Sequence, residues 1–353
     1  MNTTKQINQI EIEQVTNSSS TGEQIMRAIE LAGQVANQHA ARNSFADYTS
    51  RKAQNTVGAQ HADLVMFSTY LRAAGIPDAP SGDRLQSEPN SWIGITWGIV
   101  DGFARWQLQQ GHAISSVNRR LSTIKTYTQL AAKAGVVSTQ ELALIKTVKG
   151  YGKTEAKRIN ASREKTRIGD KKAKPVKITQ EQAKQLKRQP DIPQGRRDAL
   201  LMCLLLDHGL RVGEVAILQV SNFDLKSGTF TFERPKVDGE QTHRLTADTL
   251  RALYAWISSG DCPINGLLLR ESITGGSLTE AGINERAIKA RVRLLGERIG
   301  ITGLSPHDCR HYWATYWANK VDILRLQEAG GWASLEMPRR YVERAEIANE
   351  GMA

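Results

Sequence analysis

The chain has 353 residues, with 47 lysines and arginines against 36 aspartates and glutamates, a formal net charge of +11. Such an excess of basic residues favours a polyanionic partner, most often nucleic acid. The three cysteines lie far apart, which argues against a disulfide framework and a zinc knuckle. The longest apolar run, Ala199 to Leu206, is too short to span a bilayer, and the polar N-terminus has no signal-peptide core. We therefore expect a cytoplasmic protein of about two domains.

The first segment, residues 1–44, is predicted to be a tail that carries one amphipathic helix. Ser20-Thr21-Gly22-Glu23 resembles a capping box, and the apolar residues that follow recur at helical spacing. This helix could pack on the next domain or on another protomer, and a helix at the domain edge is the simpler interpretation.

Residues 45–150 contain three further helical patterns, which begin near Thr56, Thr96 and Ser115. Loops rich in proline and glycine separate them, so we expect a small helical bundle. The third pattern carries basic side chains away from its apolar stripe, as a helix that lies against DNA would. These candidate DNA-binding residues are Arg119, Arg120 and Lys125. A solvated basic face is an equally good interpretation of each.

A strongly basic segment follows the bundle. Twelve lysines and arginines stand against three acidic residues between Lys146 and Lys177, and glycines and a proline interrupt the run. We interpret residues 151–177 as an interdomain linker. Its basic side chains would follow DNA phosphates, although a solvated tether is the alternative. The candidates here are Lys149, Lys153 and Lys157.

The second domain is predicted to span residues 178–341 and to be mainly helical, with one β-hairpin. Its expected elements, in order, are a helix capped by Thr179, an apolar helix that ends at His208, strands over 229–233 and 242–245, helices over 248–257 and 280–299, a helix from Pro306, and a short helix around 324–326. The last residues, 342–353, are expected to be a C-terminal tail.

Several residues of this domain have the chemistry of a phosphate site. Ser305 and Pro306 suit the start of a helix, which places His307 and Arg310 one turn apart on one face. The unpaired N–H groups of a helix N-terminus favour an anion there.

Further basic and aromatic groups complete the pattern. Arg211 and Glu214 stand at i and i+3 after a glycine that ends the apolar helix, and Lys236 follows the first strand. Trp332 follows two glycines, and Tyr341 stands nine positions later. A phenol is protonated near neutrality, so a tyrosine that attacks phosphorus needs cations around the phosphate.

In this order, Arg211, Lys236, His307, Arg310, Trp332 and Tyr341 resemble the active-site set of the tyrosine recombinases, the phage integrase family. Most members have a histidine where this chain has Trp332, which makes it similar to the Cre-like variant. An indole N–H can donate one hydrogen bond but cannot carry a proton away, so Trp332 is assigned to binding. Residues 45–150 are similar in layout to the core-binding domain of that family.

The resemblance implies a mainly α, two-domain DNA clamp, with a helical core-binding domain and a mixed α/β catalytic domain. It also implies that Tyr341 forms a 3′-phosphotyrosyl link, that Lys236 protonates the leaving oxygen, and that Arg211 and Arg310 bind the phosphate with help from His307 and Trp332. Glu214 would orient His307 or Arg211. No metal or other cofactor is expected, because side chains supply the positive charge.

The partner implied is double-stranded DNA with a specific recombination site, bound by a homo-tetramer that exchanges strands through a Holliday junction. In the family the C-terminal tail often docks into a neighbouring protomer. The expected location is the cytoplasm, with the nucleoid, in a bacterial or phage-derived system. The sequence identifies neither the target site nor any accessory protein.

Two alternatives remain open at this stage. A type IB topoisomerase uses a similar set of cations and a tyrosine to relax DNA, and a DNA-binding regulator could carry a vestigial site. Tyr312 and Tyr316 are the nearby rivals for the nucleophile, and they are assigned to packing together with His311 and Trp313.

Overall fold

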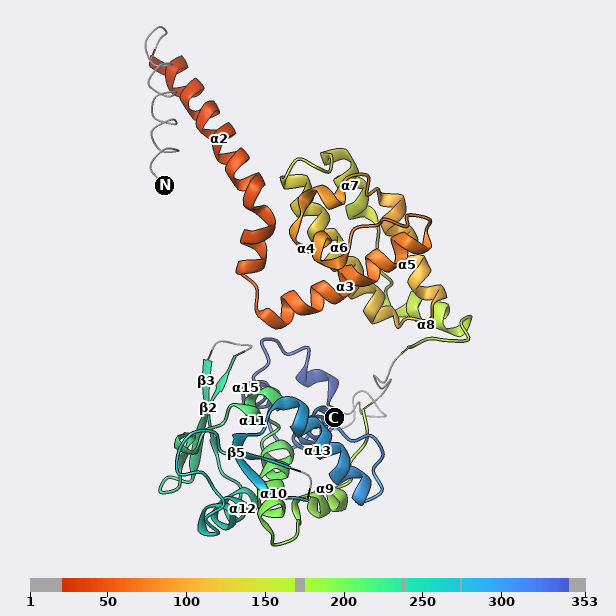
Figure 1. Cartoon of the computed structure of the whole chain (residues 1–353). Helices are drawn as coiled ribbons and strands as arrows, with labels where there is room; N and C mark the ends of the chain where they lie inside the picture. The colour runs from red at the N-terminus through yellow and green to blue at the C-terminus, as the bar shows by residue number, and fades with distance from the viewer. Residues whose placement is uncertain (1–20, 169–174, 236–238, 274, 343–353) are drawn as a thin grey trace, which may run out of the picture. The chain divides into compact units, whose positions relative to one another are not determined.

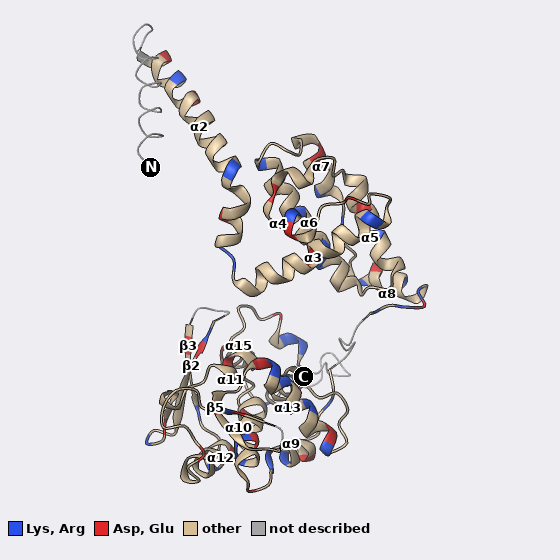
Figure 2. Ribbon diagram, viewed as in Figure 1, with Lys and Arg blue, Asp and Glu red and all other residues tan. Residues whose placement is uncertain are grey.

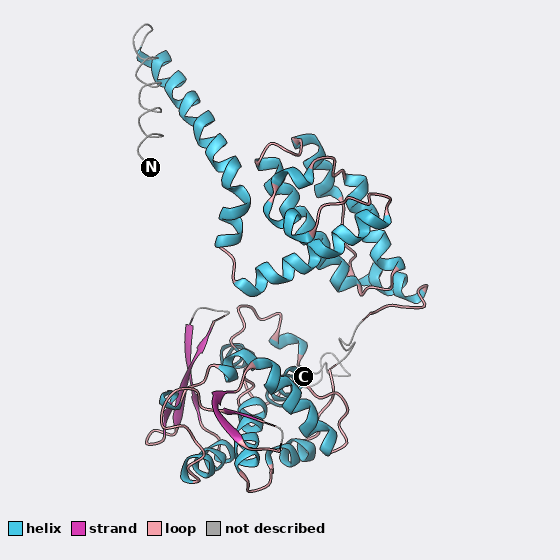
Figure 3. Ribbon diagram, in the orientation of Figure 1, coloured by secondary structure: helices cyan, strands magenta, loops and turns pink. Residues whose placement is uncertain are grey.

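The structure is a computed structural model that describes residues 21–168, 175–235, 239–273 and 275–342. The chain divides into two compact units, residues 1–171 and 172–353 (Figure 1). Helices dominate both units, and strands occur only in the second among the residues described (Figure 3). The predicted fold class, mainly α with small sheets, is confirmed.

The first unit is a bundle of helices around an aromatic core. Its largest buried side chains include Phe67, Trp92, Phe103 and Tyr127, whose rings pack against one another with centroids 5.1 to 6.2 Å apart. The elements are α2 (Thr21–Ser50), α3 (Gln54–Ala73), α4 (Gly82–Ser87), η1 (Pro89–Trp92), α5 (Trp97–Gln109), α6 (Ile114–Lys133), α7 (Thr139–Thr147) and α8 (Lys153–Ala161).

Helix α2 is much longer than the predicted helix of the tail. It continues to Ser50, so that Phe45 is buried in the bundle core, whereas its first turns extend beyond the other helices of this unit (Figure 1). The predicted cap at Ser20 lies outside the described residues. Helix α3 begins before Thr56 and α6 before Ser115, so neither side chain caps its helix.

The basic segment is not a simple linker, because Lys153–Ala161 form helix α8. Glu155 accepts a hydrogen bond from the backbone N–H of Gly152, which caps the helix start. Beyond the helix, Arg163 donates to the carbonyl of His112 at 2.8 Å, which joins this stretch to the first unit. Lysine, glutamate, alanine and arginine favour helix, and in this segment that propensity outweighs the repulsion of its charges.

The second unit contains both small sheets. Strands β1 (Phe223–Asp224), β2 (Thr229–Arg234) and β3 (Gly239–Arg244) form one antiparallel sheet, and β4 (Arg270–Ser272) pairs with β5 (Leu278–Gly282). The helical elements are α9 (Gln180–Lys187), α10 (Pro193–Asp207), α11 (Val212–Ala216), η2 (Val220–Asn222), α12 (Ala247–Ser258), α13 (Glu285–Arg298), α14 (Pro306–Ala318), α15 (Ile323–Gly330) and η3 (Pro338–Arg340).

Most predicted elements of this unit are confirmed. Thr179 caps α9, and the predicted hairpin is β2 and β3. The helix predicted over 280–299 was wrong in its first part, where residues up to Gly282 belong to β5 and Asn284 caps α13. The apolar run within α10 is almost completely buried and forms the centre of the core, so the site is built against a rigid support. Within the described residues, no helix combines the length and apolar character that crossing a membrane requires.

Candidate active site

Helix α14 places His307 and Arg310 as the sequence predicts, although its cap differs in detail. Ser305 is the N-cap residue, but its hydroxyl donates to Asp308 at 2.6 Å, and Asp308 also accepts the backbone N–H of Ser305 at 2.8 Å. His307 is exposed on the first turn. Arg310, one turn later, is only 5% exposed.

The turn between α10 and α11 holds the other predicted arginine. Arg211 is the N-cap residue of α11, and both its backbone N–H and its guanidinium donate to Glu214, the guanidinium at 2.7 Å. Glu214 therefore fixes Arg211. Gly209 has φ of +62°, and a Cβ there would lie 2.4 Å from the indole of Trp313, so this position requires glycine.

Side chains from several elements meet at the C-terminal end of α15. Gly331 ends the helix in the left-handed conformation. The carbonyls of four consecutive residues, 328–331, accept hydrogen bonds from side chains that come from β2, β3, α11 and α14. The donors are Gln241 to Glu328, Arg234 to Ala329, Arg234 and Arg310 to Gly330, and Arg211 to Gly331. The negative end of the helix dipole thus gathers three guanidinium groups.

Tyr341 lies beside this cluster in the same chain. Its ring stacks on Trp332 with centroids 5.8 Å apart, and His311 meets it edge-on at 4.9 Å. The guanidinium of Arg310 lies 4.7 Å from the centre of the Trp332 ring. Four of the predicted residues, Arg211, Arg310, Trp332 and Tyr341, are therefore brought together.

Burial shifts the pKa values of the two central groups. Removal of water and the nearby positive charge of Arg211 together lower the pKa of Arg310 to about 10, although Glu214 opposes this effect, so Arg310 stays charged at neutral pH. Burial raises the pKa of Tyr341, and Arg310 and Arg340 partly offset that rise. Tyr341 therefore rests as a neutral phenol at neutral pH, and a nucleophilic role would require it to lose that proton.

Two residues of the cluster were missed by the sequence analysis. Arg234 is 2% exposed and donates to Glu214 at 3.1 Å. His311 was assigned to packing, yet it contacts Tyr341 directly. A signal for Arg234 exists, since strand alternation places it on the same face as Phe230 and Phe232, and an arginine on a buried face must be paired. Lys236 lies outside the described residues.

The basic residues proposed for α6 have partners inside the first unit. Arg119 and Arg120 lie 2.7 and 3.7 Å from the carboxylate of Asp63, which is 1% exposed. Lys125 donates to the carbonyls of Lys146, at 3.1 Å, and Val148 at the end of α7. Their role in DNA binding stays a prediction, and these contacts give each of them a structural role as well.

Lys149, Lys153 and Lys157 differ from the α6 residues because their side chains are exposed. They lie on α8 or just before it, where Figure 2 shows basic residues on the helix and on the segment that follows. Their exposed side chains are therefore able to contact a phosphate backbone.

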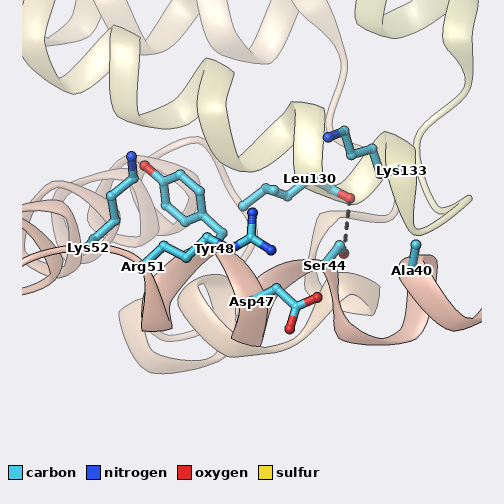
Figure 4. A pocket seen from close by; sticks show the side chains of 8 residues that line it. All are labelled: Ala40, Ser44, Asp47, Tyr48, Arg51, Lys52, Leu130 and Lys133. Carbon is cyan, nitrogen blue, oxygen red and sulfur yellow. Dashed lines mark hydrogen bonds between the residues drawn. The ribbon is translucent and has the colours of Figure 1, made fainter.

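The first unit also has a pocket of about 390 Å³ where α2 faces the end of α6 (Figure 4). Arg51, Lys52 and Lys133 line it together with Asp47, and Lys52 lies over the ring of Tyr48. The pocket lacks the combination of buried arginines and a buried tyrosine seen in the second unit. The described residues therefore favour the second unit as the catalytic one.

Comparison with known proteins agrees with this geometry. The sequence model of the phage integrase family matches residues 177–346. Tyrosine recombinase XerD of Staphylococcus haemolyticus is 24% identical over 82% of this chain and 88% of its own length, and XerC of Chlamydia muridarum is 25% identical over 84% and 91%. XerD of Neisseria meningitidis serogroup B is 28% identical, over half of this chain and 62% of its own length.

Solved structures show the same fold. The Tn1549 transposon integrase in complex with transposon right end DNA matches 88% of this chain with a TM-score of 0.60 at 13% identity. A lambda integrase dimer bound to a COC′ core site matches 92% with a TM-score of 0.56 at 15% identity. The comparisons favour a recombinase over the topoisomerase and regulator alternatives. Residues 177–346 thus form a phage integrase family domain, and over more than 80% of its length the chain is similar to tyrosine recombinases.

Proposed function

We propose that this chain cleaves and rejoins double-stranded DNA at a specific site through a phosphotyrosyl intermediate on Tyr341. The observation that carries the proposal is the stack of Tyr341 on Trp332, with the guanidinium of Arg310 over the Trp332 ring. A buried phenol beside permanently charged groups is suited to attack on an anionic phosphodiester.

In the proposed step, the Tyr341 oxygen bonds to phosphorus and the bond from phosphorus to the sugar O5′ breaks. The phenol proton passes to solvent water, and the leaving O5′ gains a proton from Lys236, which becomes neutral. Arg211 and Arg310 stabilise the charge on the five-coordinate phosphorus, and His307 and Trp332 donate to its remaining oxygens. Removal of one fixed donor of this kind typically costs about 10²–10³ in rate.

The covalent link keeps the free energy of the broken phosphodiester. Rejoining is the reverse of cleavage, in which a 5′-hydroxyl attacks the phosphotyrosyl bond, so ATP hydrolysis is not needed. Strand exchange occurs when the attacking hydroxyl comes from a second duplex. Four strands are broken in a complete exchange and each chain offers one Tyr341, which supports a homo-tetramer on DNA and a Holliday-junction intermediate.

DNA is the partner that the charge and the site support. The Tn1549 integrase structure is a complex with transposon right end DNA, and the lambda integrase dimer is bound to a COC′ core site. In this chain the exposed Lys149, Lys153 and Lys157 would contact the backbone near the first unit. We propose the cytoplasm, with the nucleoid, as the place of action. A C-terminal tail that docks into a neighbouring protomer is a further proposal, and residues 343–353 lie outside the described structure.

The test first uses the Tyr341→Phe variant to select a duplex that it binds from a pool of randomised duplexes. A nick is then placed in that duplex, so that cleavage traps the covalent product. Wild-type protein should form an adduct that survives denaturation, whereas Tyr341→Phe should bind the duplex equally well and form none. Tyr316→Phe is the matched control, because Tyr316 packs on Tyr312 and Trp317 and should keep the adduct. A stable adduct with Tyr341→Phe would falsify the assignment.

A further inference from the structure

Arg234 is the best-connected side chain of the site, although no reaction step uses it. It is the last residue of β2 and is 2% exposed. Its guanidinium donates to Glu214 at 3.1 Å, to the carbonyl of Gly330 at 3.2 Å and to that of Ala329 at 2.7 Å, and its Nε donates to Gln241. One side chain therefore joins β2, β3, α11 and the end of α15.

A second, independent feature of the backbone is fitted to the same side chain. A Cβ on Gly331 would lie 2.6 Å from Cδ and 2.8 Å from Nε of Arg234. Gly331 also has φ of +55°, which side chains other than glycine rarely adopt. The end of α15 thus approaches Arg234 more closely than any other residue type at position 331 would allow.

The partners of Arg234 are also the partners of the two arginines proposed to bind the phosphate. Glu214 accepts from both Arg211 and Arg234, and the carbonyl of Gly330 accepts from both Arg310 and Arg234. Arg234 therefore shares one hydrogen-bond acceptor with Arg211 and another with Arg310. If it moved, the acceptors that fix both guanidinium groups would move with it.

We propose that Arg234 is a positioning residue, which holds Glu214 and the end of α15 so that Arg211, Arg310 and Trp332 keep the arrangement that receives the scissile phosphate. The proposal rests on the proposed function of the site. Arg234 does not touch the substrate, and it acts through the two shared acceptors. A misplacement of catalytic groups by about 1 Å can cost about 10²-fold in rate, which sets the size of the expected effect.

If Arg234 had a purely structural role, an apolar side chain of similar volume could replace it without loss of cleavage. A buried arginine is costly to desolvate, and a well-packed apolar side chain of similar volume often stabilises a fold equally well. Arg234→Met keeps most of the stem over Phe232, whose ring centre lies 4.8 Å from the guanidinium carbon, and removes all the donors. Arg234→Lys keeps the charge but loses the forked geometry that reaches several acceptors at once.

The experiment compares single-turnover cleavage by the full chain on the nicked duplex described above. Arg234→Met should bind the duplex within about twofold of wild type and cleave it about 10²-fold more slowly. Arg234→Lys should recover part of the loss. The control is Arg244→Met, an exposed arginine on the other strand of the same hairpin, which should cleave at the wild-type rate.

A second substrate separates positioning from a general loss of structure. A methylphosphonate at the scissile position removes one negative charge and so reduces the demand on the arginine groups. The defect of Arg234→Met should shrink at least tenfold on this substrate if Arg234 acts through Arg211 and Arg310. An equal defect on both substrates, or wild-type cleavage of the phosphate by a folded Arg234→Met protein, would overturn the proposal. Failure of the wild-type chain to form any adduct would instead overturn the proposed function.

Discussion

The indole of Trp332 packs against both the phenol of Tyr341 and the guanidinium of Arg310, with its ring centre 5.8 Å from the Tyr341 ring centre and 4.7 Å from the guanidinium carbon. An aromatic ring can stack on a phenol and hold a cation on its face at the same time. One side chain therefore contacts both the proposed nucleophile and a group proposed to bind its target.

Substitution of Trp332 should separate stacking from hydrogen bonding. Trp332→Phe keeps an aromatic face but loses the N–H, so cleavage should fall by about 10²-fold if that N–H donates to the phosphate. Trp332→His restores a ring donor and should recover most of the rate. Single-turnover adduct formation measures both. Normal cleavage by Trp332→Phe would show that only the ring matters.

Gly330 should be intolerant of any side chain for a reason specific to the site. A Cβ there would lie 2.1 Å from the Trp332 ring, so Gly330→Ala must displace that ring from Tyr341 and Arg310. We expect a loss of cleavage of about 10²-fold and reduced stability. Gly98→Ala is the control, since it lies in helix α5 and a Cβ there would make only an ordinary contact of 3.9 Å with Thr96, so the change should stabilise the chain by up to about 0.8 kcal/mol. Cleavage rate and thermal unfolding are the measurements.

The second unit should lose stability in mild acid. Burial lowers the pKa of His208 to about 3, and burial together with the charge of Arg234 lowers the pKa of His243 to about 4. The folded state therefore binds these protons more weakly than the unfolded state. The stability that these neutral imidazoles provide is complete above about pH 6.5 and is lost as the pH falls, down to about 4 for His243 and about 3 for His208, by about 1.4 kcal/mol per pH unit for each imidazole.

Denaturant unfolding of this unit at a series of pH values measures whether its stability falls with decreasing pH. His208→Gln cannot titrate, so its stability should fall less steeply with acid than that of wild type, whereas exposed His39→Gln should follow the wild-type curve. Parallel curves for wild type and His208→Gln would contradict the assignment of the acid sensitivity to this histidine.

Basic residues of the first unit should fall into two classes. Lys153→Ala with Lys157→Ala removes two exposed charges, and DNA affinity should then depend less on salt, with the slope reduced by about 2. Lys125→Ala should instead reduce stability, because Lys125 holds the end of α7. Fluorescence anisotropy over a salt series and thermal unfolding distinguish the two. An unchanged slope in the double variant would remove α8 from the DNA-binding surface.

Much of this fold could be predicted from the sequence alone, because its periodic patterns are strong. Thr179 with Gln182, the apolar run in α10 and the alternation in β2 each favour one local structure. The order of the charged residues in the second unit was enough to indicate the family. The short strand β5 was not predicted, because over five residues an alternating pattern can hardly be distinguished from a helical one.

The relationships within the site were harder to predict. No local pattern shows that the end of α15 accepts hydrogen bonds from four other elements, because the residues concerned are up to 120 positions apart. The same applies to Asp63, a buried carboxylate that forms ion pairs with the half-exposed Arg119 and with the mostly buried Arg120. Charge on a helix face is visible in a sequence, whereas the partner that neutralises it is not.

The carbonyls at the end of α15 solve a problem that any cluster of like charges creates. Arg211, Arg234 and Arg310 would push one another apart in a site without an anion. The partial negative charge of a helix terminus, together with Glu214, compensates them in advance. The phosphate that we propose as ligand would thus meet a receptor that is already assembled, and none of its binding energy would be consumed in gathering the arginines.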